Sequence, residues 1–79
     1  KQLGKVIHWY DKLNVAVVSL SGPLKVGDRI KLRKGEEEVE DTVQSMQVDH
    51  KAVQSAKKGE EVAIKISQKT KEGAEFYSK

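Results

Sequence analysis

Short runs of alternating apolar residues, separated by glycine-containing turns, constrain the fold of this chain more than any other feature. Valine and isoleucine are abundant in the runs, and the turns recur at short intervals. This pattern is typical of a small all-β barrel or sandwich. The chain has 79 residues, so residues 1–79 are expected to form a single domain. We therefore predict one six-stranded antiparallel Greek-key β-barrel, closed or nearly closed.

The expected strands follow from these runs. They cover residues 3–10, 15–20, 29–34, 39–48, 62–66 and 76–77. In the fourth strand the apolar parity changes, which predicts a β-bulge near Gln44 or Ser45. Val15 to Val18 is a continuous apolar run, as expected for a strand covered on both faces. Residues 50–58 are expected to form a loop with one helical turn, because Val53 and Ala56, three residues apart, would lie on the same side of it. The predicted core consists of Leu24, Val26, Ile30, Leu32, Val43, Met46, Val62, Ile64 and Ile66.

The corner at residues 21–30 organises the rest of the chain. Gly27 can adopt a positive φ, and Asp28 is expected to bond its own backbone just beyond the turn. Residues 56–62 repeat part of this pattern: an apolar residue, two residues, Gly59, an acidic residue, one residue, then Val62. We interpret the similarity as two barrel corners that both need glycine, and not as a true repeat.

The order of these motifs resembles a known family. Gly22-x-Leu24-x-x-Gly27-Asp28-x-Ile30, residues 42–46 and residues 53–64 resemble the second domain of translational GTPases, such as elongation factor Tu and initiation factor two. The resemblance covers residues 4–77. It implies a translation-factor domain 2-like barrel in a stand-alone elongation factor-like protein that contacts RNA, either tRNA or the ribosome. The absence of cysteine fits the reducing cytoplasm, so a cytoplasmic location is expected.

Two alternatives remain open. The C-terminal barrel of collagenase-like peptidases has a comparable Val-Gly-Asp corner, here Val26 to Asp28, and a comparable Ser-Met-Gln segment, here Ser45 to Gln47. That resemblance implies a substrate- or partner-binding module of a larger enzyme. A third possibility is a protein-interaction barrel that has no RNA role.

Charge permits RNA binding but does not demand it. The chain has 15 Lys and Arg against 12 Asp and Glu, a net charge of +3. The candidate RNA-binding residues are the outward-facing cations of residues 29–34 and of the second corner: Arg29, Lys31, Arg33, Lys34, Lys57 and Lys58. Trp9, Tyr10 and Tyr77 would offer stacking surfaces if exposed. Alternatively, the basic strand is an ordinary solvated face that acidic residues 36–41 partly neutralise, and Trp9 plugs one end of the barrel.

Other chemistry is not expected. The chain has no glycine-rich phosphate loop ending in Lys-Ser or Lys-Thr, and therefore no nucleotide site is predicted. It has no cysteine, no nucleophile elbow, and only two histidines, His8 and His50. No apolar run is long enough to span a membrane. We therefore expect a non-catalytic domain without a metal or a cofactor.

Overall fold

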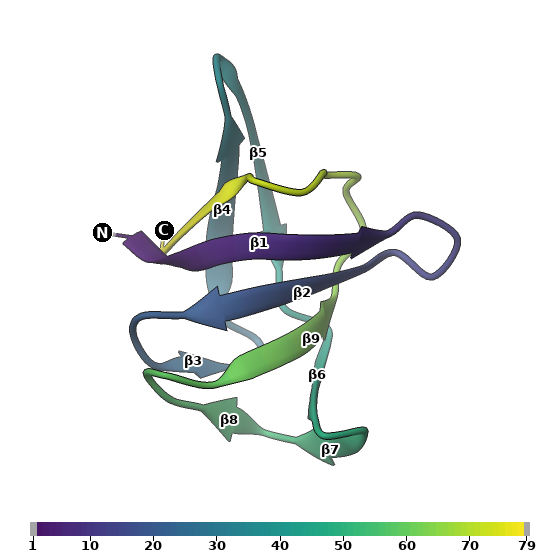
Figure 1. Ribbon diagram of the computed structural model, residues 1–79, viewed down its shortest axis with the longest axis vertical. Coiled ribbons are helices and arrows are strands. Elements are labelled where there is room, and N and C mark those ends of the chain that lie inside the picture. Colours follow the sequence, from purple (N-terminus) through teal and green to yellow (C-terminus); the bar gives the residue numbers. More distant parts are fainter. Residues whose placement is uncertain (1, 79) are drawn as a thin grey trace.

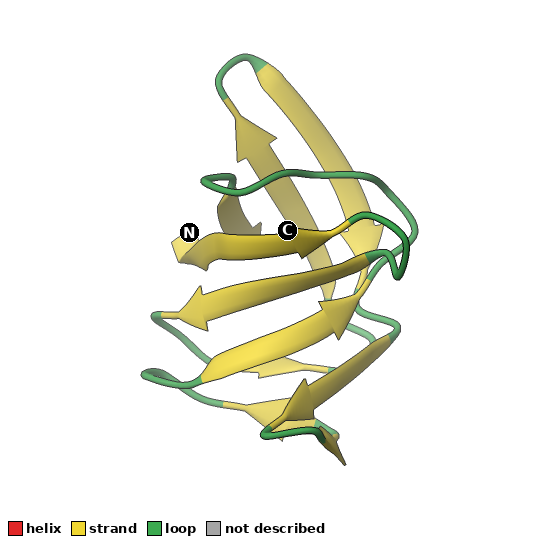
Figure 2. Ribbon diagram, turned by 45° about the vertical axis from the view of Figure 1, so that its right-hand side comes forward, coloured by secondary structure: helices red, strands yellow, loops and turns green. Residues whose placement is uncertain are grey.

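The strands of the protein wrap around one core, as a computed structural model that describes residues 2–78 shows (Figure 1). All regular elements are antiparallel strands, which confirms the all-β prediction (Figure 2). The strands are β1 (Gln2–Tyr10), β2 (Val15–Leu20), β3 (Leu24–Lys25), β4 (Arg29–Lys34), β5 (Glu37–Thr42), β6 (Ser45–Val48), β7 (Lys51–Val53), β8 (Ser55–Ala56), β9 (Glu61–Lys65) and β10 (Glu75–Ser78). Eight form one sheet in the order β5-β4-β10-β1-β2-β9-β6-β7, and β3 pairs with β8 in a second. Residues 2–78 thus contain ten strands, where the sequence predicted six for the chain. No helix long and apolar enough to cross a membrane occurs among the described residues.

The barrel curls closed because β5 and β6 belong to one bent segment that changes partner. β5 pairs with β4, whereas β6 pairs with β9. Between them, the Val43 amide donates to the Asp28 carbonyl at 3.0 Å, and the Gln44 amide donates to the Lys65 carbonyl at 3.0 Å. The interruption lies at residues 43–44, where the sequence predicted a bulge near Gln44 or Ser45. A single segment therefore joins the two sides of the sheet.

The core is close to the predicted one. Eight of the nine predicted residues are buried, and Val26 is only partly buried against the cluster. Ala16 and Val18 are fully buried, whereas Val15 and Val17 are partly exposed. The prediction that β2 is covered on both faces was therefore wrong, because the side chains of Val15 and Val17 remain partly exposed on the outside of the barrel.

Residues 49–58 differ from the prediction. Asp49 and His50 have φ values of 53° and 64°, and they connect β6 to β7 as a two-residue loop between the paired Val48 and Lys51. Two consecutive positive φ angles are typical of a type I′ hairpin turn. β8 then pairs with β3. The expected helical turn is absent from this described segment because Asp49 and His50 reverse the chain directly into a strand.

The two similar corners lie side by side. Leu24 of the first corner pairs with Ala56 of the second across β3 and β8. In each, a glycine has positive φ, 93° at Gly27 and 91° at Gly59. In each, the following acidic side chain accepts from the amide three residues earlier: Lys25 to Asp28 at 2.9 Å, and Lys57 to Glu60 at 2.8 Å. The sequence predicted that Asp28 would bond the backbone just beyond the turn. The Asp28 side chain instead bonds the Lys25 amide, which precedes the turn. The shared sequence pattern therefore encodes the same turn at both corners: a glycine with positive φ, followed by an acidic side chain that accepts a hydrogen bond from the amide three residues earlier.

Candidate binding surfaces

The basic strand β4 alternates as predicted. Ile30 and Leu32 are buried in the core, whereas Arg29 and Arg33 are exposed and Lys31 is partly exposed on the outer face. Alternation places successive side chains of a strand on opposite faces of the sheet. The structure therefore brings these three cations together on one face of the barrel.

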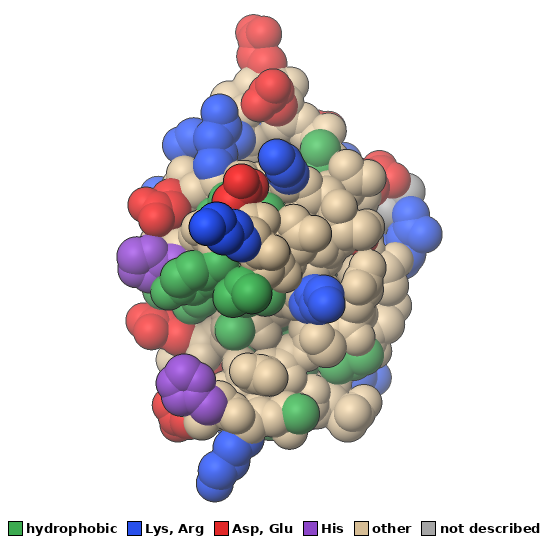
Figure 3. Space-filling view, turned by 90° about the vertical axis from the view of Figure 1, so that its right-hand side faces the viewer, with side chains coloured by type: hydrophobic (Ala, Val, Ile, Leu, Met, Phe, Trp, Pro, Cys, Tyr) green, Lys and Arg blue, Asp and Glu red, His purple; other side chains and the backbone are tan. Residues whose placement is uncertain are grey.

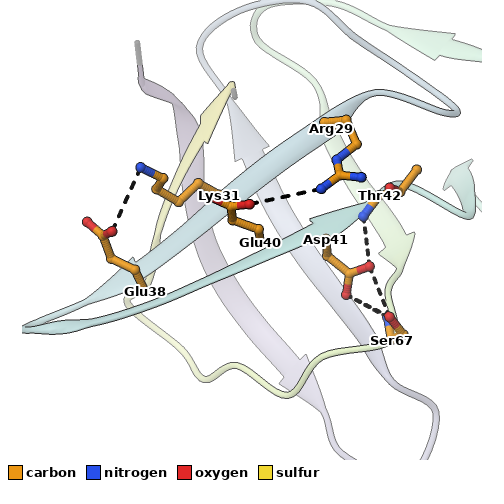
Figure 4. A network of polar contacts seen from close by, with 7 residues as sticks. All are labelled: Arg29, Lys31, Glu38, Glu40, Asp41, Thr42 and Ser67. Carbon is orange, nitrogen blue, oxygen red and sulfur yellow. Dashed lines mark hydrogen bonds and ion pairs between the residues drawn. The ribbon is translucent and has the colours of Figure 1, made fainter.

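The cations of β4 are neutralised by acidic side chains of β5. Lys31 lies opposite Glu40, and Arg33 lies opposite Glu38. Arg29 Nη2 lies 3.9 Å from Glu40 Oε1, and Lys31 Nζ lies 3.8 Å from Glu38 Oε1 (Figure 4). Arg33 Nε lies 3.8 Å from Glu38 Oε2. These pairs are solvent-exposed, so each contributes little to stability. They nevertheless reduce the positive potential that a phosphate backbone would meet.

The remaining candidate cations lie elsewhere. Lys34 ends β4 at the tip of the β4–β5 hairpin, where its Nζ lies against Gly73. Lys57 and Lys58 are exposed in the corner after β8, which lies at the opposite end of the molecule from that hairpin tip (Figure 1). The six predicted cations therefore do not form one stripe.

An apolar surface lies at the β1–β2 turn. We call Trp9, Tyr10 and Leu13 the apolar turn surface. Leu13 is 63% exposed and Tyr10 is 48% exposed. Trp9 packs partly against the core, and its indole N–H donates to Asp11 Oδ1 at 3.2 Å. Figure 3, which looks at this end of the molecule, shows hydrophobic side chains gathered there. The three side chains, with residues 11 and 12, border a hollow of about 440 Å³.

Tyr77, the third predicted stacking residue, lies on β10. Its hydroxyl donates to Glu75 Oε1 at 3.0 Å. This hydrogen bond is the main reason why the pKa of Tyr77 is raised above its ordinary value. Tyr77 and the apolar turn surface come from different strands and do not form a joint platform for bases.

Asp41 is the buried carboxylate of this barrel. Its Oδ1 accepts from the Thr42 amide at 2.7 Å, and its Oδ2 accepts from the Ser67 amide at 2.8 Å (Figure 4). The same Oδ2 accepts from the Gln68 amide at 2.7 Å. Burial by itself raises the pKa of Asp41, but the hydrogen bonds from Thr42, Gln68 and Ser67 outweigh it and hold the pKa below its ordinary value. The carboxylate thereby fastens β5 to the segment that follows β9.

The family follows from a comparison with known proteins. The family model described as elongation factor Tu domain 4 matches residues 3–77.

The chain belongs to this family.

This match confirms the predicted resemblance to elongation factor Tu. The sequence motifs indicated the second domain of translational GTPases, whereas the matching family model is described as domain 4.

The chain is also similar to proteins described as an uncharacterized protease and a putative peptidase. An uncharacterized protease of Methanocaldococcus jannaschii is 42% identical over 77 residues, which cover 96% of this chain and 19% of the relative. The chain thus spans about a fifth of that relative's length. Two solved structures of the C-terminal domain of a putative U32 peptidase from Geobacillus thermoleovorans share the fold. One has a TM-score of 0.91 at 13% identity, covering 100% of this chain and 92% of that one. The other, a selenomethionine variant, has a TM-score of 0.89 at 14% identity, covering 98% of each.

Sequence reasoning missed two features of this barrel. Leu13 falls between the expected strands 3–10 and 15–20, and a leucine between Lys12 and Asn14 in a polar turn is a signal for an exposed apolar side chain. Asp41 was grouped with acidic residues that neutralise the basic strand. Its donors on Ser67 and Gln68 lie 26 and 27 residues away, so no local pattern reveals them.

Proposed function

We propose that this chain is a non-catalytic accessory domain of a U32-type peptidase and that it binds protein. The observation that carries the proposal is the 42% identity to a protease over 96% of the chain, together with the occurrence of the same fold as the C-terminal domain of a U32 peptidase. The collagenase-like peptidase alternative from the sequence is therefore preferred to the stand-alone translation factor.

The apolar turn surface suits contact with another protein. Exposed Leu13 and Tyr10 lie next to partly buried Trp9, and aromatic residues are enriched at the centres of protein interfaces. The turn lies at the far end of β1 from Gln2, the residue where β1 begins (Figure 1). The surface therefore lies away from the end of the barrel at which β1 begins.

The buried carboxylate suits a structural role. All of its described partners are donors that hold two backbone segments, and its pKa is held low. A general acid or base at neutral pH instead needs a pKa near the working pH. Asp41 itself is therefore suited to holding the barrel together and not to proton transfer.

A domain exchange tests the proposal. The archaeal protease would be prepared in three forms: intact, without the 77-residue segment that matches this chain, and with that segment replaced by this chain. We expect similar hydrolysis of short peptides by all three forms. Protein substrates should be cleaved more slowly after deletion, and the replacement should restore the rate. The proposal fails if the replacement does not restore cleavage, or if the isolated chain hydrolyses peptides itself.

RNA binding is a second candidate, supported by the family description and by one corner. Lys57 and Lys58 are exposed, and neither forms an ion pair with any residue from 2 to 78. If this corner contacts phosphates, the double variant Lys57→Gln/Lys58→Gln should lower RNA affinity and reduce its salt dependence. The variant Arg29→Gln/Lys31→Gln carries the same charge change on the neutralised face and should have less effect. Equal effects of the two variants, or no measurable RNA binding, would count against this candidate.

A further inference from the structure

A groove runs between the β4–β5 hairpin and the segment before β10. It has a volume of about 440 Å³, within the range of sites for small ligands. Its floor is apolar and is formed by buried Leu32 and partly buried Val39. The β4–β5 hairpin forms its first wall, and the segment from Lys69 to Lys71 forms its second wall. The groove is separate from the apolar turn surface.

The second wall is held at both ends. At one end, the amides of Ser67 and Gln68 donate to Asp41. At the other end, the Gly73 amide donates to the Val6 carbonyl at 2.8 Å, and the Val6 amide donates to the Ala74 carbonyl at 2.8 Å. Residues 69–72 therefore form a short strap that is anchored on both sides, and a ligand would meet a positioned wall and not a free loop.

A glycine makes room for one cation of the groove. Gly73 has a φ of 87°, and a Cβ at this position would lie 2.7 Å from Lys34 Nζ. The Lys34 side chain thus crosses from the hairpin to the strap directly over the Gly73 backbone. This arrangement places its ammonium group on the same groove as Lys69 and Lys71.

The charge around the groove is positive. Lys34, Lys69 and Lys71 face Glu37 and Glu38, and Glu38 already lies within 3.8 Å of both Lys31 and Arg33. Lys69 also lies 3.8 Å from Asp11 in an exposed pair, which a ligand carboxylate can replace at little cost. An apolar floor bordered by three ammonium groups complements a ligand with carboxylates and an aliphatic side chain.

We infer that this groove binds an acidic peptide segment whose aliphatic side chain contacts Leu32 and Val39 while its acidic side chains pair with Lys34, Lys69 and Lys71. The inference rests on the proposed protein-binding function and names a site for it. A nucleic acid fits less well, because it offers no aliphatic side chain for the apolar floor of Leu32 and Val39. Thr70, on the strap between the two lysines, adds a hydroxyl that can donate to a carboxylate.

Binding can be measured by NMR with the isotopically labelled 79-residue chain. The probe is an acetylated and amidated peptide, Glu-Glu-Leu-Glu-Glu, which carries acidic side chains without a terminal carboxylate. A matched peptide has Ser in place of Leu, and an RNA oligonucleotide provides the rival ligand. We expect amide shifts at Val39, Thr70 and Lys71, and weaker binding of the Ser peptide by about fivefold, as loss of a partly buried aliphatic side chain requires.

Charge variants test the site. Lys69→Gln/Lys71→Gln removes two exposed charges and should weaken the Leu peptide about fivefold. Lys57→Gln/Lys58→Gln carries the same charge change outside the groove and should alter affinity by less than about twofold. The inference is wrong if the shifts avoid the groove, if both variants weaken binding equally, if the Ser peptide binds as tightly, or if RNA shifts the same amides more strongly.

The outcome is separable from that of the domain exchange. If the exchange restores protein cleavage but the peptide does not bind, the groove assignment fails and the accessory role stands. If the peptide binds in the groove but the exchange fails, the site stands without the link to peptidase activity.

Discussion

Asp41 and Ser67 are joined by the Ser67 amide and hydroxyl, which both donate to the Asp41 carboxylate, at 2.8 Å from N to Oδ2 and at 3.0 Å from Oγ to Oδ1. The two residues are 26 positions apart in sequence. Their contact holds the end of β5 against the segment after β9, close to where the bent segment changes partner. The barrel closure and the strap that walls the groove therefore depend on the same carboxylate.

Replacing this carboxylate should destabilise the fold. In Asp41→Asn, the amide group turns a donor toward one of the donors of Ser67 or Gln68, which leaves a buried N–H unsatisfied. We expect the free energy of unfolding to fall by about 2–4 kcal/mol in urea denaturation. Asp49→Asn is a matched control on an exposed turn and should cost less than about 0.5 kcal/mol. Equal effects of the two substitutions would show that the Asp41 contacts are not structurally important.

The same group predicts how stability depends on pH. The pKa of Asp41 in the folded state lies below the ordinary value of 3.8. As the pH falls below 3.8, the unfolded state takes up this proton before the folded state does, so the stabilisation is present in full above that value and is lost toward the folded pKa. Stability measured between neutral and acidic pH should therefore fall more steeply for the wild type than for Asp41→Asn. Parallel profiles would contradict the assignment.

Two glycines should differ in their tolerance of alanine. At Gly4, a Cβ would overlap the Ser19 carbonyl oxygen on β2, a backbone atom that cannot move without disturbing the sheet. We expect Gly4→Ala to cost about 3 kcal/mol or more. At Gly59, a Cβ would meet nothing within 4 Å, and only the positive φ of 91° is unfavourable. Gly59→Ala should cost about 1–2 kcal/mol. A smaller loss for Gly4→Ala in the same denaturation assay would argue against the close β1–β2 approach.

The apolar turn surface predicts a functional change without a structural one. Leu13→Ser removes a side chain that is 63% exposed, so the free energy of unfolding should change by less than about 0.5 kcal/mol. In the domain-exchange protease, this variant should slow cleavage of protein substrates and leave short peptides unaffected. Lys51→Ser, at an exposed position on β7, is the control. Unchanged protein cleavage in Leu13→Ser would remove this surface from the proposal.

The sequence predicted well the features that rest on local patterns. Alternation in residues 29–34 placed Ile30 and Leu32 inside, and the Gly27 turn has the expected positive φ. The helical turn over residues 50–58 was predicted from the three-residue spacing of Val53 and Ala56. That spacing is weak evidence for a helical turn. Asp49 and His50, whose residue types tolerate positive φ, instead form a tight hairpin turn just before this segment.

Features that depend on distant residues were not predictable. The sequence placed Arg29, Lys31 and Arg33 on one face but did not show which acidic residues lie opposite them. The β4–β5 register decides that, and it brings Glu38 and Glu40 within reach. The groove has the same origin, because its lysines come from the hairpin tip and from a strap more than thirty residues later.

The position of β10 has a consequence for how the protein is made. β10 lies between β4 and β1, so a central strand of the large sheet is contributed by residues 75–78. On a ribosome, the earlier strands emerge while this slot is still open, and Phe76, which is fully buried in the finished core, arrives only afterwards. Completion of the barrel is therefore coupled to completion of this part of synthesis. A chain terminated before residue 75 would expose the facing edges of β1 and β4 to pairing with other nascent chains.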